Sequence, residues 1–126
     1  TRVYALDLLA IIRATEVHSI SHITGGGFAN NLVRVIPAGI GVDIDRGSWR
    51  PPAVFELVRQ VGGLSLPDVE ATLNQGVGMA LVLPESSVGE AQRLAAAAGI
   101  DSWVAGTATA EPGAPARVDL HGDHPS

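Results

Sequence analysis

The sequence has 126 residues, of which 46% are hydrophobic, no cysteine, and a formal net charge of −5 at pH 7. A chain of this length fits one domain with a hydrophobic core of its own. The lack of cysteine excludes disulfides, thiolate nucleophiles and cysteine-ligated zinc, and it favours a cytoplasmic location. All eight cationic side chains are arginine and they form no basic cluster, so we expect no binding to nucleic acid. No apolar run approaches the ~20 residues of a membrane span and no signal peptide is visible, so we expect no membrane contact.

The periodicity of the apolar residues predicts alternating helices and strands. Helical spacing predicts a buried helix over 4–14, and alternation of polar and apolar residues predicts a strand over 17–23. Three glycines at 25–27 separate this strand from a helix at about 28–36. Residues 121–126 are expected to form a loose tail. The remaining elements, in chain order, are a strand at 40–44, a helix at 54–61 closed by Gly62-Gly63, a helical turn from Ser65 to about Leu73, a strand at 80–83, a helix from Ser87 to Ala98, and strands at 103–108 and 116–120.

These elements predict an α/β (α+β) fold, a single domain with a mixed β-sheet of about four to six strands packed by helices. The near-continuous apolar run at 80–83 is typical of a central strand. The first residue, Thr1, is not methionine, so we expect the sequence to be a piece of a longer chain.

The strand–glycine–helix unit around 25–27 is the first candidate binding site. Glycines leave no β-carbon to obstruct a ligand, and backbone N–H groups at a helix start favour a phosphate. A tight, flexible turn explains the glycines equally well. A dinucleotide-binding fingerprint is disfavoured because Asn30 stands at its third glycine position, and a Walker loop is excluded because the sequence has no lysine.

A resemblance to a known family rests on four motifs that occur in order. They are Thr1-Arg2-x-Tyr4, His22-x-Thr24-Gly25-Gly26-Gly27-Phe28, Trp49-x-x-Pro52-x-x-Phe55 and Asn74-x-Gly76-Val77-Gly78-Met79. Together they resemble the C-terminal domain of aminoimidazole ribonucleotide synthetase, also called phosphoribosylformylglycinamidine cyclo-ligase. The resemblance implies that residues 1–120 form a substrate-binding domain of the synthetase type. It also implies that the N-terminal domain of the family, which binds ATP and forms the dimer, has no counterpart here.

The activity implied by this resemblance is an ATP-dependent ring closure in purine biosynthesis. The family converts formylglycinamidine ribonucleotide to aminoimidazole ribonucleotide, with ATP and Mg²⁺ bound mainly by the N-terminal domain. The implied partners are therefore a small ribonucleotide substrate, the missing N-terminal domain and a second copy in a full-length homodimer. The isolated fragment is expected to be inactive.

The resemblance also implies roles for particular residues. Gly25-Gly26-Gly27 would hold the substrate phosphate, with Thr24 as a hydroxyl donor and Phe28 as a further substrate-binding residue. His22 would be the catalytic residue, through hydrogen bonds to the substrate amide or to the phosphoryl group. Asn74, Gly76 and Gly78 would form a second substrate loop, and Arg2 would approach from the domain junction. No residue is assigned as a metal ligand. Gln75 and Leu73 depart from the family pattern, which we interpret as packing changes.

Several of these residues also have purely structural interpretations. His18 and His22 share one strand face, and we assign a structural role to His18 alone. Trp49 and Phe55 are either core residues or domain contacts. His121 and His124 have ligand-like spacing but no third ligand, which does not predict a metal site.

An unusually apolar face is also expected, because the missing domain would cover it. Its candidate residues are Tyr4 with the helix behind it, Trp49, Phe55 and 77–79. The alternative functions are a related ATP-dependent enzyme, such as formylglycinamidine synthetase, selenophosphate synthetase, thiamine-phosphate kinase or a hydrogenase maturation protein, and a stand-alone, non-catalytic ligand-binding module.

Overall fold

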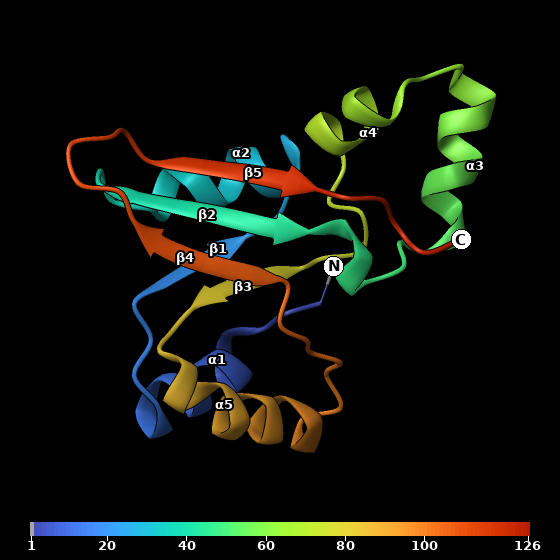
Figure 1. Ribbon diagram of the computed structural model, residues 1–126. Helices are drawn as coiled ribbons and strands as arrows, with labels where there is room; N and C mark the ends of the chain where they lie inside the picture. Colours follow the sequence, from blue (N-terminus) through green and yellow to red (C-terminus); the bar gives the residue numbers. More distant parts are fainter. Residues whose placement is uncertain (1) are drawn as a thin grey trace.

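The computed structural model describes residues 2–126, so Thr1 of the first motif lies outside the described residues. Five strands form two separate hydrogen-bonded sheets (Figure 1). In the first sheet, β1 (Ser19–His22) pairs antiparallel with β3 (Met79–Val82). In the second, β2 (Ile40–Asp45) lies between β4 (Gly106–Ala110), which is antiparallel to it, and β5 (Arg117–His121), which is parallel.

The predicted α/β class, with a mixed sheet and helices packed against strands, is confirmed. The strands are divided between two sheets, however, and β3 is not a central strand. Each of its four residues is half-buried, because β3 has a single partner strand. Its apolar run reflects contacts on both faces of a two-stranded sheet, since Ala80 and Val82 reach the main core from one side.

The helices surround these sheets (Figure 1). The elements in chain order are α1 (Ala5–Ala14), α2 (Gly27–Leu32) continued by the 3₁₀ turn η1 (Val33–Val35), the 3₁₀ turn η2 (Arg46–Ser48), α3 (Ala53–Gly62), α4 (Leu66–Thr72) and α5 (Glu85–Ala97). Helices α1 and α5 contact each other, and α2 contacts α4. No helix within residues 2–126 has the length and apolar character needed to cross a membrane.

Two of the predicted helix ends, those at Ser65 and Gly99, are confirmed, and a third prediction is wrong. Ser65 caps α4 as predicted, because its side chain accepts a hydrogen bond from the Asp68 N–H. Gly99, with φ +70°, ends α5 as predicted. The prediction that Ser87 begins α5 is wrong. The helix begins at Glu85 after Pro84, and the Ser87 N–H donates to the Pro84 carbonyl as part of the first turn.

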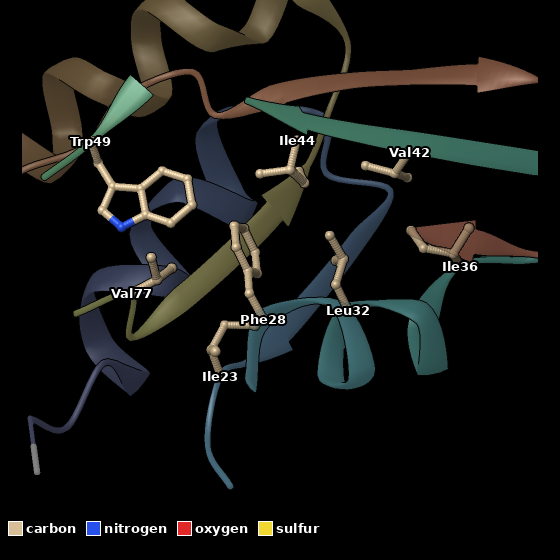
Figure 2. Close-up of a cluster of buried hydrophobic side chains, with 8 residues drawn as sticks. All are labelled: Ile23, Phe28, Leu32, Ile36, Val42, Ile44, Trp49 and Val77. Atoms are coloured by element: carbon tan, nitrogen blue, oxygen red, sulfur yellow. The ribbon is translucent and has the colours of Figure 1, made fainter. Parts of the chain in front are cut away.

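The core lies between the glycine-loop helix α2 and the three-stranded sheet. Figure 2 shows its eight buried side chains: Ile23, Phe28, Leu32, Ile36, Val42, Ile44, Trp49 and Val77. The rings of Phe28 and Trp49 meet edge to face with centroids 5.9 Å apart. Trp49 is therefore a core residue and not part of an exposed face, and the same holds for Val77, which is 5% exposed.

Exposed apolar side chains lie on α1 and α3. The expectation of a buried helix at 4–14 is wrong, because Leu6 is 82% exposed and Ile11 is the one buried residue of α1. On α3 the exposed apolar side chains are Val54, Leu57, Val58 and Val61. The exposed apolar residues therefore do not form the single face that was expected, because α1 and α3 lie at opposite ends of the molecule (Figure 1) and Trp49 and Val77 are buried. Patches of this kind on a folded domain are typical of interaction surfaces.

Candidate functional site

The glycine loop is tied to the fold through its backbone. The Gly26 N–H donates to the Thr72 carbonyl over 3.3 Å, and the Gly27 N–H donates to the Thr24 carbonyl over 3.1 Å. The N–H groups of Gly26 and Gly27 are therefore already bonded within the fold, contrary to a loop that offers all its N–H groups to a phosphate. Helix α2 spans only six residues before the 3₁₀ turn, so its dipole adds little to an anion site.

Gly25 and Gly27 differ in how much space a β-carbon would have. A β-carbon at Gly27 would lie 1.6 Å from the Glu70 carbonyl oxygen, and Gly27 has φ +75°. Close packing of α2 on α4 therefore requires glycine at this position. A β-carbon at Gly25 would have no atom within 4 Å. Of these two glycines, Gly25 is the one whose surroundings are open to a ligand.

Asn31 holds the loop in shape and was not identified from the sequence. Its side chain is 6% exposed, and its Nδ2 donates to the carbonyls of Thr24, Gly25 and Gly27 over 3.3, 3.2 and 2.7 Å. An amide group with two N–H bonds can serve several nearby carbonyls in this way. The only sequence signal is a polar residue at a position of α2 that helical spacing assigns to the core.

Arg34 is a second residue that sequence reasoning missed. Its Nη2 lies 4.0 Å from the place that a β-carbon on Gly26 would occupy. Arg34 takes part in none of the ion pairs found among residues 2–126. The sequence did contain a signal for this role, since Arg34 is the one arginine or lysine between residues 17 and 36 and follows the glycine loop closely. The glycine loop thus has an unpaired guanidinium beside it.

His22 and Thr24 are both exposed on either side of the buried Ile23. The His22 ring stands edge to face with Tyr4, with centroids 6.5 Å apart. The Ile23 N–H donates to the Gly78 carbonyl over 2.9 Å, which ties this segment to the second predicted loop. His22, Thr24 and Gly25 are thus the exposed residues of this segment.

The second loop is a tight turn with its polar groups largely engaged. Asn74 Oδ1 accepts from the Gly76 N–H over 3.0 Å, and the Asn74 carbonyl accepts from the Val77 N–H over 2.9 Å. Gln75, with φ +53°, is 4% exposed and its carbonyl accepts from the Trp49 indole N–H over 3.2 Å. A β-carbon on Gly78 would lie 2.1 Å from the Tyr4 hydroxyl oxygen. These contacts explain Gly78 by packing.

Arg2 lies away from the glycine loop. Its guanidinium donates to the carbonyls of Ala98 and Gly99 at the end of α5, over 2.9 and 3.4 Å. Two hollows separate the predicted residues: Gly26 and Phe28 line one of about 180 Å³, and Arg2 and Gly76 line another of about 340 Å³. Neither of these two hollows has His22, Thr24 or Gly25 in its lining, and Arg2 lies apart from Gly26 and Phe28.

A pair of charged side chains supports the α4 side of the smaller hollow. Arg46 Nε and Nη2 donate to the two carboxylate oxygens of Glu70 over 2.7 and 2.8 Å. Burial is the largest single influence and would raise the pKa of Glu70, but the hydrogen bonds and charge of Arg46, together with the contact from His124, outweigh burial and the pKa is lowered. Glu70 is thus a carboxylate that is held in place at neutral pH.

The described residues do not fit a magnesium site. Within residues 2–126 no group of three or more histidine, aspartate or glutamate side chains could hold a metal ion. Neutralisation of a nucleotide's phosphates by a lysine is also impossible in a sequence without lysine.

The α/β architecture and the segment from His22 to Phe28, in which His22, Thr24 and Gly25 are exposed, define a domain with a glycine loop between a strand and a helix. Residues 1–119 match the family described as "AIR synthase related protein, C-terminal domain". The chain belongs to this family.

Three relatives give the match more detail. A Streptomyces fradiae protein, named as a candidate phosphoribosylformylglycinamidine cyclo-ligase, is 49% identical over 109 residues. That match covers 86% of this chain and 60% of the relative. The phosphoribosylformylglycinamidine cyclo-ligase of Symbiobacterium thermophilum is 41% identical over 91% of this chain, and that of Shouchella clausii is 40% identical over 86%. The chain spans only 33% and 32% of these two proteins.

Proposed function

We propose that this chain is the ribonucleotide-binding part of an ATP-dependent cyclo-ligase that closes the imidazole ring of formylglycinamidine ribonucleotide. The product would be aminoimidazole ribonucleotide, an intermediate of purine biosynthesis. Support comes from membership of the family and from relatives whose names carry this activity. ATP and Mg²⁺ would be held mainly by the N-terminal domain of the longer protein.

The observation that carries the proposal is the unpaired Arg34 guanidinium beside the open glycine loop. A guanidinium can form two parallel hydrogen bonds to a phosphate, and such charge-assisted bonds are about twice as strong as neutral ones. The exposed Thr24 hydroxyl offers another donor, and Gly25 allows the phosphate to approach the backbone. Together these groups form a site for the ribose phosphate of the substrate.

His22 would then face the reacting end of the substrate. Its imidazole is exposed and precedes the loop by three residues, so a substrate anchored by its phosphate at Gly25 extends past it. The edge-to-face contact with Tyr4 limits the orientation of the ring. We assign His22 a hydrogen-bonding role toward the substrate amide during ring closure. Asn74 and Gly76 would border the neighbouring hollow, which Gly76 lines together with Arg2, and Arg2 would stiffen the domain junction through α5.

The exposed faces of α1 and α3 would contact the partner domain. Leu6 and Leu57 are 82% and 58% exposed here, which is costly for an isolated domain but ordinary for a surface buried in a longer protein. The full-length protein is proposed to act as a homodimer in the cytoplasm.

The proposed function is tested by ring-closure assays with formylglycinamidine ribonucleotide, ATP and Mg²⁺. The 126-residue chain alone should show no turnover. In a full-length protein carrying this domain, His22→Ala should lower kcat with little change in the substrate KM, whereas Arg34→Gln should raise KM. His18→Ala is the matched control, because His18 is exposed on the same strand face but bound to Glu16 over 2.9 Å. Unchanged kinetics for both His22→Ala and Arg34→Gln would contradict the proposal.

A further inference from the structure

Strand β4 is the most exposed strand of the fold. All five of its residues, Gly106–Ala110, are exposed, whereas every other strand within residues 2–126 contains buried or half-buried residues. It forms one edge of the three-stranded sheet, with β2 on one side and no strand of residues 2–126 on the other (Figure 1). A free strand edge presents backbone N–H and C=O groups that can pair with another strand.

The register with β2 shows which backbone groups of β4 are free. In an antiparallel pair, residues bonded to the partner strand alternate with residues whose N–H and C=O groups point away from it. The Asp45 N–H donates to the Ala105 carbonyl over 2.8 Å, and the register continues from there along β4. Thr107 and Thr109 therefore belong to the residues bonded to β2. The residues whose N–H and C=O groups point away from β2 are Gly106, Ala108 and Ala110.

This edge lacks the features that usually protect a free strand. Natural edges are protected by charged side chains, by proline or by a bulge. The sequence of β4, Gly-Thr-Ala-Thr-Ala, has no charge and no proline, and its register with β2 has no bulge. The opposite edge strand, β5, carries Arg117, Asp119 and His121, and α2 contacts it. Of the two edges of this sheet, the one at β4 is thus suited to accept another strand.

The C-terminal segment does not supply that strand. The His124 Nδ1 lies 3.1 Å from the Arg46 carbonyl oxygen, and the His124 ring stands edge to face with Trp49, with centroids 4.6 Å apart. Residues 121–126 are therefore not the loose tail that the sequence predicts. Because this segment is anchored, it is not free to pair with β4.

A second copy of the chain fits the edge when a twofold axis passes beside Ala108. In antiparallel pairing centred there, Ala108 faces Ala108 of the second copy, and Gly106 faces Ala110. Each such pair exchanges two backbone hydrogen bonds, so every outward N–H and C=O group of β4 gains a partner. Thr107 and Thr109 face each other at the closer, non-hydrogen-bonded positions, where threonine pairs stabilise a sheet.

The distribution of charge also favours a second copy. No charged side chain lies within β4, and the adjoining Glu111 would face Ala105 of the second copy, so no like charges meet. The contact is small, however. A strand of this length spans ~17 Å, and a stable interface buries about 800 Å² on each partner. We therefore expect a weak association that requires a high protein concentration.

We propose that β4 is a self-association edge. Two copies of the chain pair antiparallel through β4, with Ala108 at the centre, and their three-stranded sheets join into one continuous sheet. This contact is separate from the glycine loop and from the dimerisation attributed to the missing N-terminal domain, so it does not rest on the proposed function.

The first test follows the 126-residue chain from about 20 μM to about 1 mM by sedimentation velocity and by solvent-exchange NMR. The sedimentation coefficient should rise with concentration. Over the same range, solvent exchange of the Gly106, Ala108 and Ala110 amides should slow at least about threefold. The Thr107 and Thr109 amides should change less, because they already bond to β2. A chain that does not associate, or that associates without slowing exchange at these three amides, would overturn the proposal.

The second test uses two double variants at the same exposed positions. Thr107→Lys with Thr109→Lys places lysine opposite lysine across the contact and should abolish the association. Thr107→Lys with Thr109→Glu places lysine opposite glutamate and should restore it. Leu57→Glu on α3 is the control and should leave the association unchanged, since Leu57 lies outside the contact. Equal association of the two double variants, or loss of association in Leu57→Glu alone, would show that another surface joins the copies and that the proposal is wrong.

Discussion

The α-carbon of Gly27 packs against the backbone carbonyl of Glu70 so closely that a β-carbon at position 27 would lie 1.6 Å from the carbonyl oxygen. This contact joins the start of α2 to the middle of α4 and sets the position of the glycine loop. Gly27→Ala must therefore separate two helices and adopt an unfavourable φ of +75°. We expect a loss of unfolding free energy of about 2–4 kcal/mol.

Gly25→Ala is the matched variant for that prediction. A β-carbon at Gly25 meets no atom within 4 Å, so the unfolding free energy should change by less than about 1 kcal/mol. Urea denaturation of both variants makes the comparison. Equal destabilisation by the two substitutions would show that the loop glycines are not distinguished by packing.

Asn31→Ala should loosen the glycine loop. Three backbone carbonyls lose their shared donor, and the cost should be about 1–3 kcal/mol. Asn30→Ala is the control, because Asn30 is exposed and makes one bond, to the Gly26 carbonyl over 2.8 Å. Hydrogen exchange at 24–28 should accelerate in Asn31→Ala and remain close to the unmodified rate in Asn30→Ala. The reverse order would mean that Asn31 does not hold the loop.

Trp49→Ala should destabilise the isolated chain by about 3–5 kcal/mol, because the indole is 7% exposed and lies at the centre of the core. Trp103→Ala should cost less than about 2 kcal/mol, since Trp103 is 37% exposed and its ring only borders that of Trp49. Thermal unfolding followed by circular dichroism checks both values. A small effect of Trp49→Ala on the unfolding free energy would contradict the core role and favour the interpretation of Trp49 as a domain contact.

Asp43 should titrate well below the ordinary aspartate range. Hydrogen bonds from Arg117, and then from His121, lower its pKa from 3.8 to about 2. A lowered pKa means that the ion pairs stabilise the fold above the ordinary aspartate range and that this stabilisation is lost as pH falls toward 2. Carboxyl ¹³C NMR measures the titration directly. Arg117→Gln should raise the pKa more than His121→Gln, and an equal response to both would show that Arg117 is not the main cause.

The exposed apolar faces of α1 and α3 can be tested separately. Leu6→Glu and Leu57→Glu should each change the unfolding free energy of this chain by no more than about 0.5 kcal/mol, since both side chains are exposed. Each should weaken binding to a separately prepared N-terminal domain of a full-length relative, measured by calorimetry. If a substitution leaves this binding unchanged, the helix that carries it is not part of the proposed domain junction.

The sequence was most informative where local chemistry decides the structure. Ser65 and Gly99 were placed correctly, because a helix cap and a left-handed helix end depend on neighbouring residues alone. Burial was harder to predict. The apolar residues of α1 have the spacing of a buried helix, but spacing cannot tell whether the covering surface belongs to this domain or to another part of a longer protein.

The candidate site was predicted only where its residues are neighbours in sequence. The His22–Phe28 segment is continuous in sequence, and its motif located it. Asn31 on α2 and Arg34 on η1 lie beside the loop because the chain turns there. No motif encodes this proximity. His124 reaches the α4 side of the loop from the far end of the chain, and its contacts with Arg46 and Glu70 depend on the tertiary fold.

The most direct test of the proposed phosphate site is a titration of the 126-residue chain with inorganic phosphate, followed by ¹H–¹⁵N chemical shifts. The account predicts that the largest early shifts occur at Thr24 to Phe28 and that Arg34→Gln abolishes them while the fold is retained. Arg50→Gln is the control, because Arg50 lines the separate hollow together with Arg2. Shifts that are largest around Arg2 and Arg50, or that persist in Arg34→Gln, would contradict the assignment of the glycine loop as the anion site.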